Sequence, residues 1–377
     1  MRPHAPLAPH KPFDKLFPLA AAAAISLAGL LTSAPAAAQA ASPSATAARP
    51  GGNYVRGTDS YASRPDAMQF ADEVAARRGL DRDWVRATIG NARYLPNVPR
   101  LMLPAPPSAG PRNWEAYRDR VVDPVRIAAG ARFWRDNAAT LARAEADFGV
   151  PPEIIVGILG VETVYGRNMG NFRVLDALAT LAFDFPAAHP RAAERQAFFR
   201  SELESFLSVE SRTSENPLLP LGSYAGATGM PQFMPSSIAK YAVDYDGDGR
   251  IDLVNDPVDV IGSVANYFKA FGWKRGVPPV FPVTLDESRL QKQVLLAPDI
   301  KPTFSADAFV AGGAVLHGPA LKYDGLLALI ELPNGYDAPS YVAGTQNFWV
   351  ITRYNWSSFY AMSVIELGRA VRAAMEQ

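Results

Sequence analysis

The chain has 377 residues and no formal net charge, because 37 Lys and Arg residues balance 37 Asp and Glu residues. Hydrophobic residues make up 48% of the chain, enough for two or three compact units, which excludes disorder over most of its length. With no cysteine and only four histidines, disulfides, thiolate nucleophiles and multi-histidine metal centres are excluded. If the protein is an enzyme, we expect its proton transfers to depend on carboxylates.

Residues 1–40 are predicted to be a cleaved signal peptide. Three basic residues precede the apolar run 16–31: Arg2, Lys11 and Lys15. A small-x-small pattern follows at 38–40, where a signal peptidase would cleave. The alternative, a membrane anchor, is disfavoured because the run is short and interrupted by Pro18 and Gly29.

Residues 41–52, rich in Ser, Pro, Ala and Thr, are predicted to be a flexible leader. Cleavage after Ala40 removes three of the 37 basic and one of the 37 acidic residues, which leaves 34 and 36 and a charge of −2. That balance gives no general attraction to nucleic acid or to anionic membranes. We therefore expect a soluble, exported protein with no stable membrane anchor.

Residues 53–148 are predicted to form a helical domain, joined by a C-terminal helix within 356–377. Apolar residues recur at helical spacing among charged ones. The predicted helical stretches are 66–89, 114–122 and 128–148, with a Pro- and Gly-rich loop at 103–112. Gly149 is expected to end the last helix.

A second unit is predicted at 149–272, centred on a helix at 154–165 that Gly166 ends. Prolines 151 and 152 suit the first turn of this helix. Because the segment is apolar on nearly every side, it should be the buried centre of the unit.

Glu162 is a candidate general acid in this helix. It lies on the same face as Ile155 and Ile158 and near the helix C-terminus. Burial and the helix dipole would both raise its pKa and keep the carboxyl protonated near neutral pH, as a general acid requires. The alternative is a structural Glu162 paired with Arg167 or Arg173, and the local pattern leaves both interpretations open.

Residues 222–235 are uncharged and dense in Gly and aromatic side chains. Such a segment lets a ligand approach the backbone and offers hydroxyl, amide and ring contacts, which suits a sugar; a buried interdomain loop is the alternative. Ser223 directly follows Gly222, so it does not form a nucleophile elbow. Helices are predicted on the N-terminal side, at 175–182 and 198–207, with a loop at 186–196.

An acidic loop begins at Asp244. Its positions 1, 3, 5 and 9 are Asp244, Asp246, Asp248 and Asp252, with Gly249 at position 6. This pattern is typical of an EF-hand calcium loop, and helix-like segments flank it at 236–243 and 258–271. Position 12 is Asn255 rather than Glu, so Asp256 or Asp259 would have to complete the cage. We predict a structural Ca²⁺ bound weakly, with a dissociation constant of roughly 10⁻⁴–10⁻³ M, rather than a bare acidic turn.

Residues 273–355 are predicted to form a small antiparallel β domain. Short β-prone runs occur at 280–283, 294–296, 326–332 and 348–352, separated by Pro, Gly and Asp. Residues 360–375 return to an amphipathic helical pattern.

Several of these segments, in the same order, resemble the lytic murein transglycosylase B family, glycoside hydrolase family 103. The matching segments are 150–163, 222–236, the acidic loop with 263–268, and 350–355, and the similarity runs from about 70 to 375. The resemblance implies an α+β, mainly α fold, with a lysozyme-like core, an EF-hand-type loop at 244–259, a flanking helical domain and a small β domain. It also implies cleavage of the bond between N-acetylmuramic acid and N-acetylglucosamine in peptidoglycan, with 1,6-anhydromuramic acid ends.

Carried over to this sequence, the resemblance makes Glu162 the only catalytic acid and base. The substrate-binding residues that it implies are Tyr117, Ser223, Gln232, Tyr267, Tyr354, Asn355 and Tyr360. The implied metal ligands are Asp244, Asp246, Asp248, the Arg250 carbonyl and Asp259. No organic cofactor is implied, and the partners are peptidoglycan glycan strands.

The chain departs from the family pattern in three places. Where two adjacent Arg residues often follow the proline matching Pro186, an insertion leaves Arg191 and Arg195 as the nearest basic residues. Thr228 stands where Met is common. No cysteine is available for a lipid anchor.

The resemblance implies that Glu162 first protonates the glycosidic oxygen and then accepts the proton of the sugar's C6 hydroxyl. Two other functions remain open at this point. One is a muramidase that uses water, with Asp176 or Asp184 as its second carboxylate. The other is a non-catalytic protein that binds peptidoglycan.

Overall fold

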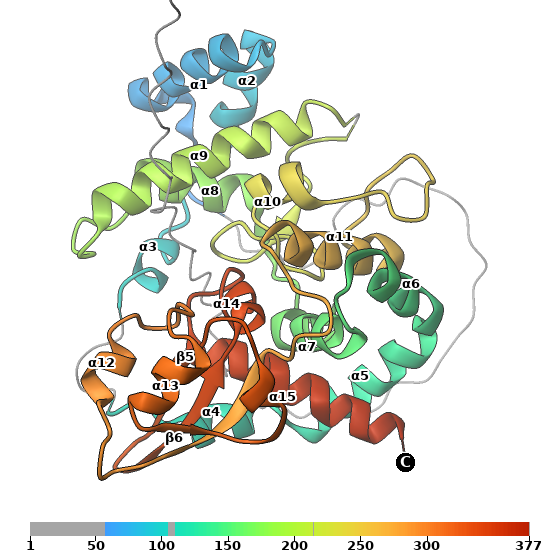
Figure 1. Ribbon diagram of the computed structural model, residues 1–377. Helices are drawn as coiled ribbons and strands as arrows, with labels where there is room; N and C mark the ends of the chain where they lie inside the picture. Colours follow the sequence, from blue (N-terminus) through green and yellow to red (C-terminus); the bar gives the residue numbers. More distant parts are fainter. Residues whose placement is uncertain (1–56, 105–109, 214, 377) are drawn as a thin grey trace, which may run out of the picture.

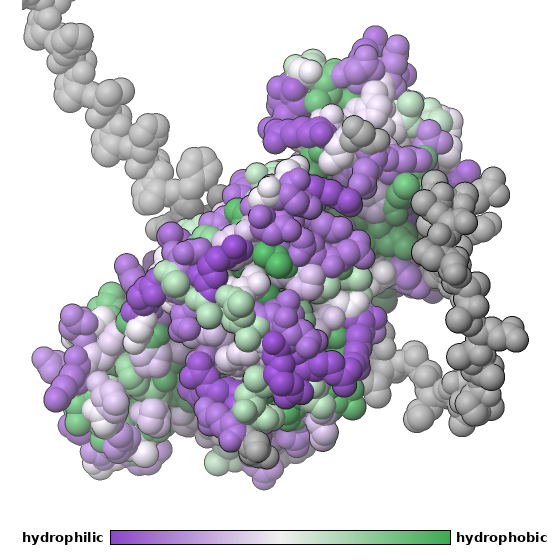
Figure 2. All heavy atoms as spheres, turned by 90° about the vertical axis from the view of Figure 1, so that its right-hand side faces the viewer, coloured by the Kyte–Doolittle hydropathy of each residue, from purple (hydrophilic) through white to green (hydrophobic). Residues whose placement is uncertain are grey.

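The structure is a computed structural model that describes residues 57–104, 110–213 and 215–376 (Figure 1). The signal peptide predicted at 1–40 and the leader at 41–52 lie outside these residues. Within the described ranges, no helix is both long and apolar enough to cross a membrane. Figure 2 shows one face, on which hydrophilic side chains predominate and apolar ones lie in scattered patches, as on a water-facing surface.

The first hydrophobic core joins helices from two distant parts of the sequence. Its helices are α1 (Pro65–Arg78), α2 (Arg82–Gly90), α3 (Val98–Leu101), α8 (Val174–Phe183) and α9 (Ala192–Glu210). Helices α1, α2, α8 and α9 lie in the upper part of Figure 1, where α9 runs across beneath α1 and α2, and α3 lies lower on the left. The rings of Phe70 and Phe183 pack edge to face, with their centroids 5.6 Å apart. Within this core α2 packs on α1, and α3 packs on α8.

The second, central core surrounds α7 (Pro152–Thr163). Its other helices are α4 (Trp114–Val121), α5 (Pro124–Asp136), α6 (Ala138–Phe148), α11 (Pro257–Ala270), α14 (Gln346–Ile351) and α15 (Ser358–Met375). The short α10 (Pro235–Tyr241) packs between α9 and α11. Most residues of α7 are buried, as its apolar sequence predicted.

Helices α7 and α15 pack against each other at very short range. Gly157 of α7 faces the carbonyl oxygen of Val364, and Gly368 of α15 faces the carbonyl oxygen of Glu153. A Cβ atom at either glycine would overlap the facing backbone. The absence of a side chain at these two positions thus sets the distance between the helices.

The third core lies in a four-stranded antiparallel sheet of order β4-β3-β6-β5. The strands are β3 (Val280–Leu285), β4 (Ala314–Leu316), β5 (Ala328–Asn334) and β6 (Asp337–Gly344). Side chains of β5 alternate: Ala328 and Ile330 belong to the central core, whereas Leu329 packs with Leu295 of α12 (Lys292–Leu296) and Phe309 of α13 (Ala306–Ala311). One face of the sheet thus rests on the central core. A separate two-stranded pair joins β1 (Phe172–Arg173) and β2 (Leu221–Gly222).

The predicted fold class, mainly helical with a small antiparallel sheet, is confirmed, but several predicted elements are wrong. The predicted helix 128–148 is two helices, separated at Asn137, whose side chain donates to the Phe133 carbonyl and competes with the helical pattern. Helix α9 begins at Ala192, inside the predicted loop 186–196. The β-prone runs 294–296 and 348–352 lie in or at the end of helices α12 and α14, because short apolar runs suit either structure.

The domain boundaries drawn from the sequence stay a prediction. The packing shows which of the predicted segments share a core. Helices α1 to α3 share a core with α8 and α9, whereas α4 to α6 share one with α7 and α15. The two parts of the segment 53–148 therefore belong to different cores.

The close contact between α7 and α15 predicts the effect of Gly157→Ala. An added methyl group must push the helices apart, so the free energy of unfolding should fall by about 1–3 kcal/mol, although alanine ordinarily favours a helix. Chemical denaturation measures this change. Gly90→Ala is the control, since a Cβ there would lie 3.4 Å from the Ala62 Cβ, an ordinary contact. Equal stability of the two variants would contradict the account.

Candidate active site

Glu162 lies in the last turn of α7 with its side chain partly buried. The hydroxyl of Tyr360, in α15, donates a hydrogen bond to its Oε1 atom. Burial raises the pKa of Glu162 to about 7, and the bond from Tyr360 offsets part of that rise. The predicted alternative, an ion pair with Arg167 or Arg173, is wrong: Arg173 binds Asp176, and no Arg in the described chain pairs with Glu162. The carboxyl is therefore protonated for much of the time at neutral pH.

Four tyrosines surround this carboxyl, from four elements of the central core. They are Tyr117 of α4, Tyr267 of α11, Tyr354 after α14, and Tyr360 of α15. Burial raises the pKa of each hydroxyl, and the negative charge of Glu162 raises it further. All four are therefore neutral hydrogen-bonding groups near neutral pH, and the tertiary structure brings together tyrosines that are far apart in the sequence.

Two of these tyrosines are fixed by backbone acceptors. The Tyr267 hydroxyl donates to the carbonyl of Arg353 at 2.8 Å, and the Tyr354 hydroxyl donates to the carbonyl of Pro231 at 2.8 Å. Their rings pack together with centroids 4.9 Å apart. Asn355 follows Tyr354 directly, and its carbonyl accepts from the Ser357 backbone just before α15 begins. The segment 353–360 is thus held against the central core at several points.

The chain that leaves α7 after Glu162 supports the uncharged loop 222–235. The hydroxyl of Thr163 donates to the Met230 carbonyl at 2.9 Å. Gly170 lies against the backbone of Gly222 and Ser223 so closely that no side chain would fit. This close approach requires glycine, as does the φ of +94° at Gly170.

Ser223 and Gln232, the two predicted binding residues in this loop, are held by different contacts. The Ser223 Oγ atom accepts from the backbone N–H groups of Ala225 and Ala227 at 3.3 and 3.1 Å. Gln232 has a φ of 51°, rare for a residue with a side chain, and its amide donates to the Met169 carbonyl at 3.1 Å. The Gln232 side chain therefore adjoins the segment that continues from Glu162, whereas the Ser223 side chain stabilises a turn within the loop.

Sequence analysis missed Glu202, which holds this loop in place. The carboxylate is 2% exposed and accepts from the Ser236 backbone N–H at 2.9 Å and the Ser236 hydroxyl at 2.6 Å. It thereby ties the start of α10, directly after the loop, to α9. The signal available in the sequence was its spacing, since Glu202 lies on the apolar face of α9 with Phe199 and Phe206.

Two left-handed residues, also missed, end α7 directly after the site. Val164 and Tyr165 have φ angles of 51° and 56°. This conformation is unfavourable for residues with a Cβ atom, and most of all for a β-branched one. The surrounding packing holds them there, and they turn the chain away from Glu162 toward the loop.

The two carboxylates considered as hydrolytic partners belong to the first core. Asp176 is 1% exposed and binds Arg173 and the backbone N–H of Arg93. Asp184 accepts from Tyr61 and Arg64. Neither forms a hydrogen bond to Glu162 or to the four tyrosines in the described part of the chain. Neither is therefore placed to act as the second carboxylate of a hydrolase.

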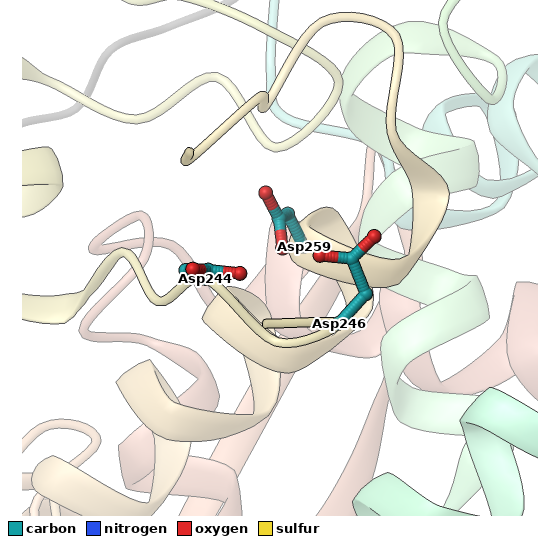
Figure 3. Close-up of side chains that lie close together, drawn as sticks. All are labelled: Asp244, Asp246 and Asp259. Carbon is teal, nitrogen blue, oxygen red and sulfur yellow. The ribbon is translucent and has the colours of Figure 1, made fainter. Parts of the chain in front are cut away.

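Three carboxylates converge in the acidic loop (Figure 3). Asp244, Asp246 and Asp259 each have one oxygen within 4.8 Å of the others, and Asp259, in the first turn of α11, is buried. A set of oxygens at this spacing suits a hard cation such as Ca²⁺. The Asp248 carboxylate is not in this cluster, because it accepts from the Arg250 backbone N–H at 2.8 Å. Ligation by Asp248 and by the Arg250 carbonyl stays a prediction.

Comparisons with known proteins agree with this architecture. The chain is 41% identical over 325 residues to membrane-bound lytic murein transglycosylase B of Escherichia coli (strain K12), a match that covers 84% of this chain and 85% of that protein. The E. coli lytic transglycosylase SLT35, solved in complex with bulgecin A and with calcium, is 40% identical, with a TM-score of 0.73 over 88% of this chain and 100% of that one. Lytic transglycosylase SltB1 of Pseudomonas aeruginosa is 39% identical, with a TM-score of 0.74 over 84% of this chain and 99% of that one.

The match to a known family spans both the site and the acidic loop. Residues 62–369 match the transglycosylase SLT domain, a range that contains Glu162, its four tyrosines and the three clustered carboxylates. The chain therefore belongs to the transglycosylase SLT domain family.

Proposed function

We propose that the protein cleaves the β-1,4 bond between N-acetylmuramic acid and N-acetylglucosamine in peptidoglycan and leaves 1,6-anhydromuramic acid ends. Its family and its relatives make it a peptidoglycan lytic transglycosylase. The observation that carries the mechanism is the environment of Glu162, a carboxyl with a pKa of about 7 that is surrounded by tyrosines.

A single carboxyl is enough for this reaction. Oε1 of Glu162 accepts from Tyr360, so Oε2 is available to carry the acidic proton toward the glycosidic oxygen. Protonation breaks the bond to C1 of the muramyl sugar, whose acetamido group stabilises the positive charge. The Glu162 carboxylate then takes the proton from the C6 hydroxyl, whose oxygen attacks C1 and closes the anhydro ring, which restores the acid.

The neighbouring groups favour this route over hydrolysis. Glycoside hydrolysis ordinarily uses two carboxyl groups across the bond, and Asp176 and Asp184 are occupied in the first core. We assign the tyrosines, Ser223, Gln232 and Asn355 to sugar binding, since they offer neutral hydrogen bonds and ring faces.

We propose that the acidic loop binds a structural Ca²⁺ in the manner of an EF-hand. Asp244, Asp246 and Asp259 would hold the ion, which would neutralise the repulsion among their charges. The loop is already shaped by its backbone, because Asp259 accepts from the N–H groups of Tyr245 and Asp252 at 2.7 and 2.8 Å. A relative solved in complex with calcium supports the assignment. The ion would join the end of α10 to the start of α11 and takes no part in the chemistry.

We place the mature protein in the periplasm. The basic, apolar and small-x-small patterns in residues 1–40 support export, and peptidoglycan is the material on which its relative acts.

Glu162→Gln should lower turnover on purified peptidoglycan by at least about 10²–10⁴-fold, because the amide can neither donate nor accept the transferred proton. Mass spectrometry of the released fragments checks this and should find anhydro-ended muropeptides from the wild type. Glu210→Gln is the matched control, since burial raises the pKa of Glu210 to about 7 as well, at the end of α9. Reducing muramic acid ends from the wild type would instead identify a muramidase, and binding without cleavage would identify a non-catalytic protein.

The pH dependence of kcat/KM should show an alkaline limb near pH 7, because the general acid must be protonated and the pKa of Glu162 in the free protein is about 7. Tyr360→Phe removes a hydrogen bond that favours the carboxylate, so the pKa should rise and the limb should move to higher pH. Tyr341→Phe, which breaks a similar bond to Glu331 at 2.7 Å in the β domain, should leave the limb in place. A shift to lower pH in Tyr360→Phe would refute this role.

Calcium should raise the melting temperature of the wild type. For a dissociation constant of about 1 mM, about 10 mM Ca²⁺ stabilises the folded state by about 1.4 kcal/mol, a shift of a few degrees. Asp246→Asn should abolish most of this shift, whereas Asp83→Asn, an equal charge change in α2, should retain it. Thermal unfolding with and without Ca²⁺ measures both, and equal shifts in the two variants would place the ion elsewhere.

A further inference from the structure

Beside the site, an arginine is held between two tryptophan rings. The guanidinium carbon of Arg353 lies 4.1 Å from the Trp349 ring centroid and 4.3 Å from that of Trp356. Burial lowers the pKa of Arg353 to about 10, so the group is still charged at neutral pH. Its N–H groups donate to the Trp349 carbonyl and the Thr352 hydroxyl, and no carboxylate among the described residues pairs with it. The two rings therefore supply much of its stabilisation.

The outer ring of this stack, Trp356, is exposed and yet fixed. It is 41% exposed, with one face covered by the Arg353 guanidinium. Its indole N–H donates to Asp299 Oδ2 at 3.3 Å, and Asp299 is itself held at a φ of 56° after α12. Fixing a side chain costs conformational entropy, and an indole exposed to water does not gain the free energy that burial of its apolar surface would provide. A ring that is both fixed and exposed is preorganised to bind a ligand.

The position of Trp356 makes it continuous with the active site. It directly follows Asn355, and the Arg353 carbonyl accepts the hydroxyl of Tyr267. Tyr360, which binds Glu162, lies four residues further on, so the two Cα atoms are at most about 14 Å apart. By contrast Tyr336, 95% exposed at the β5–β6 turn, forms no hydrogen bond or ring stack within the described ranges.

We propose that the free face of Trp356 stacks on a sugar ring of the glycan strand outside the two rings that flank the scissile bond. A pyranose presents a flat face of C–H groups, which packs on an indole without a charged partner. The contact makes the enzyme prefer long strands to short fragments, with Arg353 and Asp299 as residues that position the ring. This inference rests on the proposed function, since the strand is the substrate of the same site.

The test measures the binding of glycan strands of graded length. All variants also carry Glu162→Gln, so that the strands are bound but not cleaved. Trp356→Ala should weaken binding of long strands roughly tenfold, or about 1.4 kcal/mol, and weaken the shortest fragment that spans the scissile bond much less. Trp356→Phe should lose less, because a ring remains. Tyr336→Ala is the control and should bind both lengths like the parent.

A loss that is equal for all lengths, or no loss at all, would overturn the proposal. Because Trp356→Ala can also disturb the fold, Asp299→Gly provides a second measurement: glycine accepts the left-handed φ, and only the bond to the indole is lost. It should show a smaller loss in the same, length-dependent sense. Failure of the proposed function is distinguishable, since wild-type protein would then release no anhydro products even if strands bind.

Discussion

The close contact between α7 and α15 is the constraint on which the site depends. Gly157 and Gly368 let the two backbones meet directly, and this brings Tyr360 of one helix to Glu162 of the other. The two residues are 198 positions apart, so only the helix packing makes them neighbours. Any side chain at the crossing would separate the acid from the hydroxyl that holds its Oε1 atom.

This arrangement has a cost in stability. A buried carboxyl with a raised pKa destabilises the fold as pH rises from its unfolded pKa toward its folded one, because the folded state retains a proton that the unfolded state releases. The left-handed Val164 and Tyr165 add backbone strain two and three residues further on. These unfavourable features lie together at the end of α7, where a proton donor is needed, and the apolar length of the helix offsets them through burial.

The other cores serve to hold groups around this helix end. Glu202 of the first core fixes the start of α10 and with it the loop of Ser223 and Gln232. One face of the sheet rests on the central core, and Asp299, in the loop after α12, positions Trp356. Asp259 of α11 accepts from the backbone N–H groups of Tyr245 and Asp252 and so ties the loop after α10 to α11, which carries Tyr267. Each element near the substrate is thus supported from a different part of the chain.

The sequence by itself determined the local features. The apolar run around Glu162, the acidic spacing of 244–252, the uncharged loop 222–235 and the mainly helical pattern all depend on near neighbours and could be predicted. Short apolar runs such as 294–296 and 348–352 were assigned wrongly because only tertiary packing selects helix or strand for them. The resemblance to a known family, rather than residue spacing, had singled out the four tyrosines, and the tertiary structure brings them to one carboxyl. Tertiary structure alone decided that Asp176 and Asp184 bind elsewhere and that Glu202 supports the site. The physical reason is that burial and hydrogen bonding across a core depend on which helices touch, and residue spacing along one helix does not encode that.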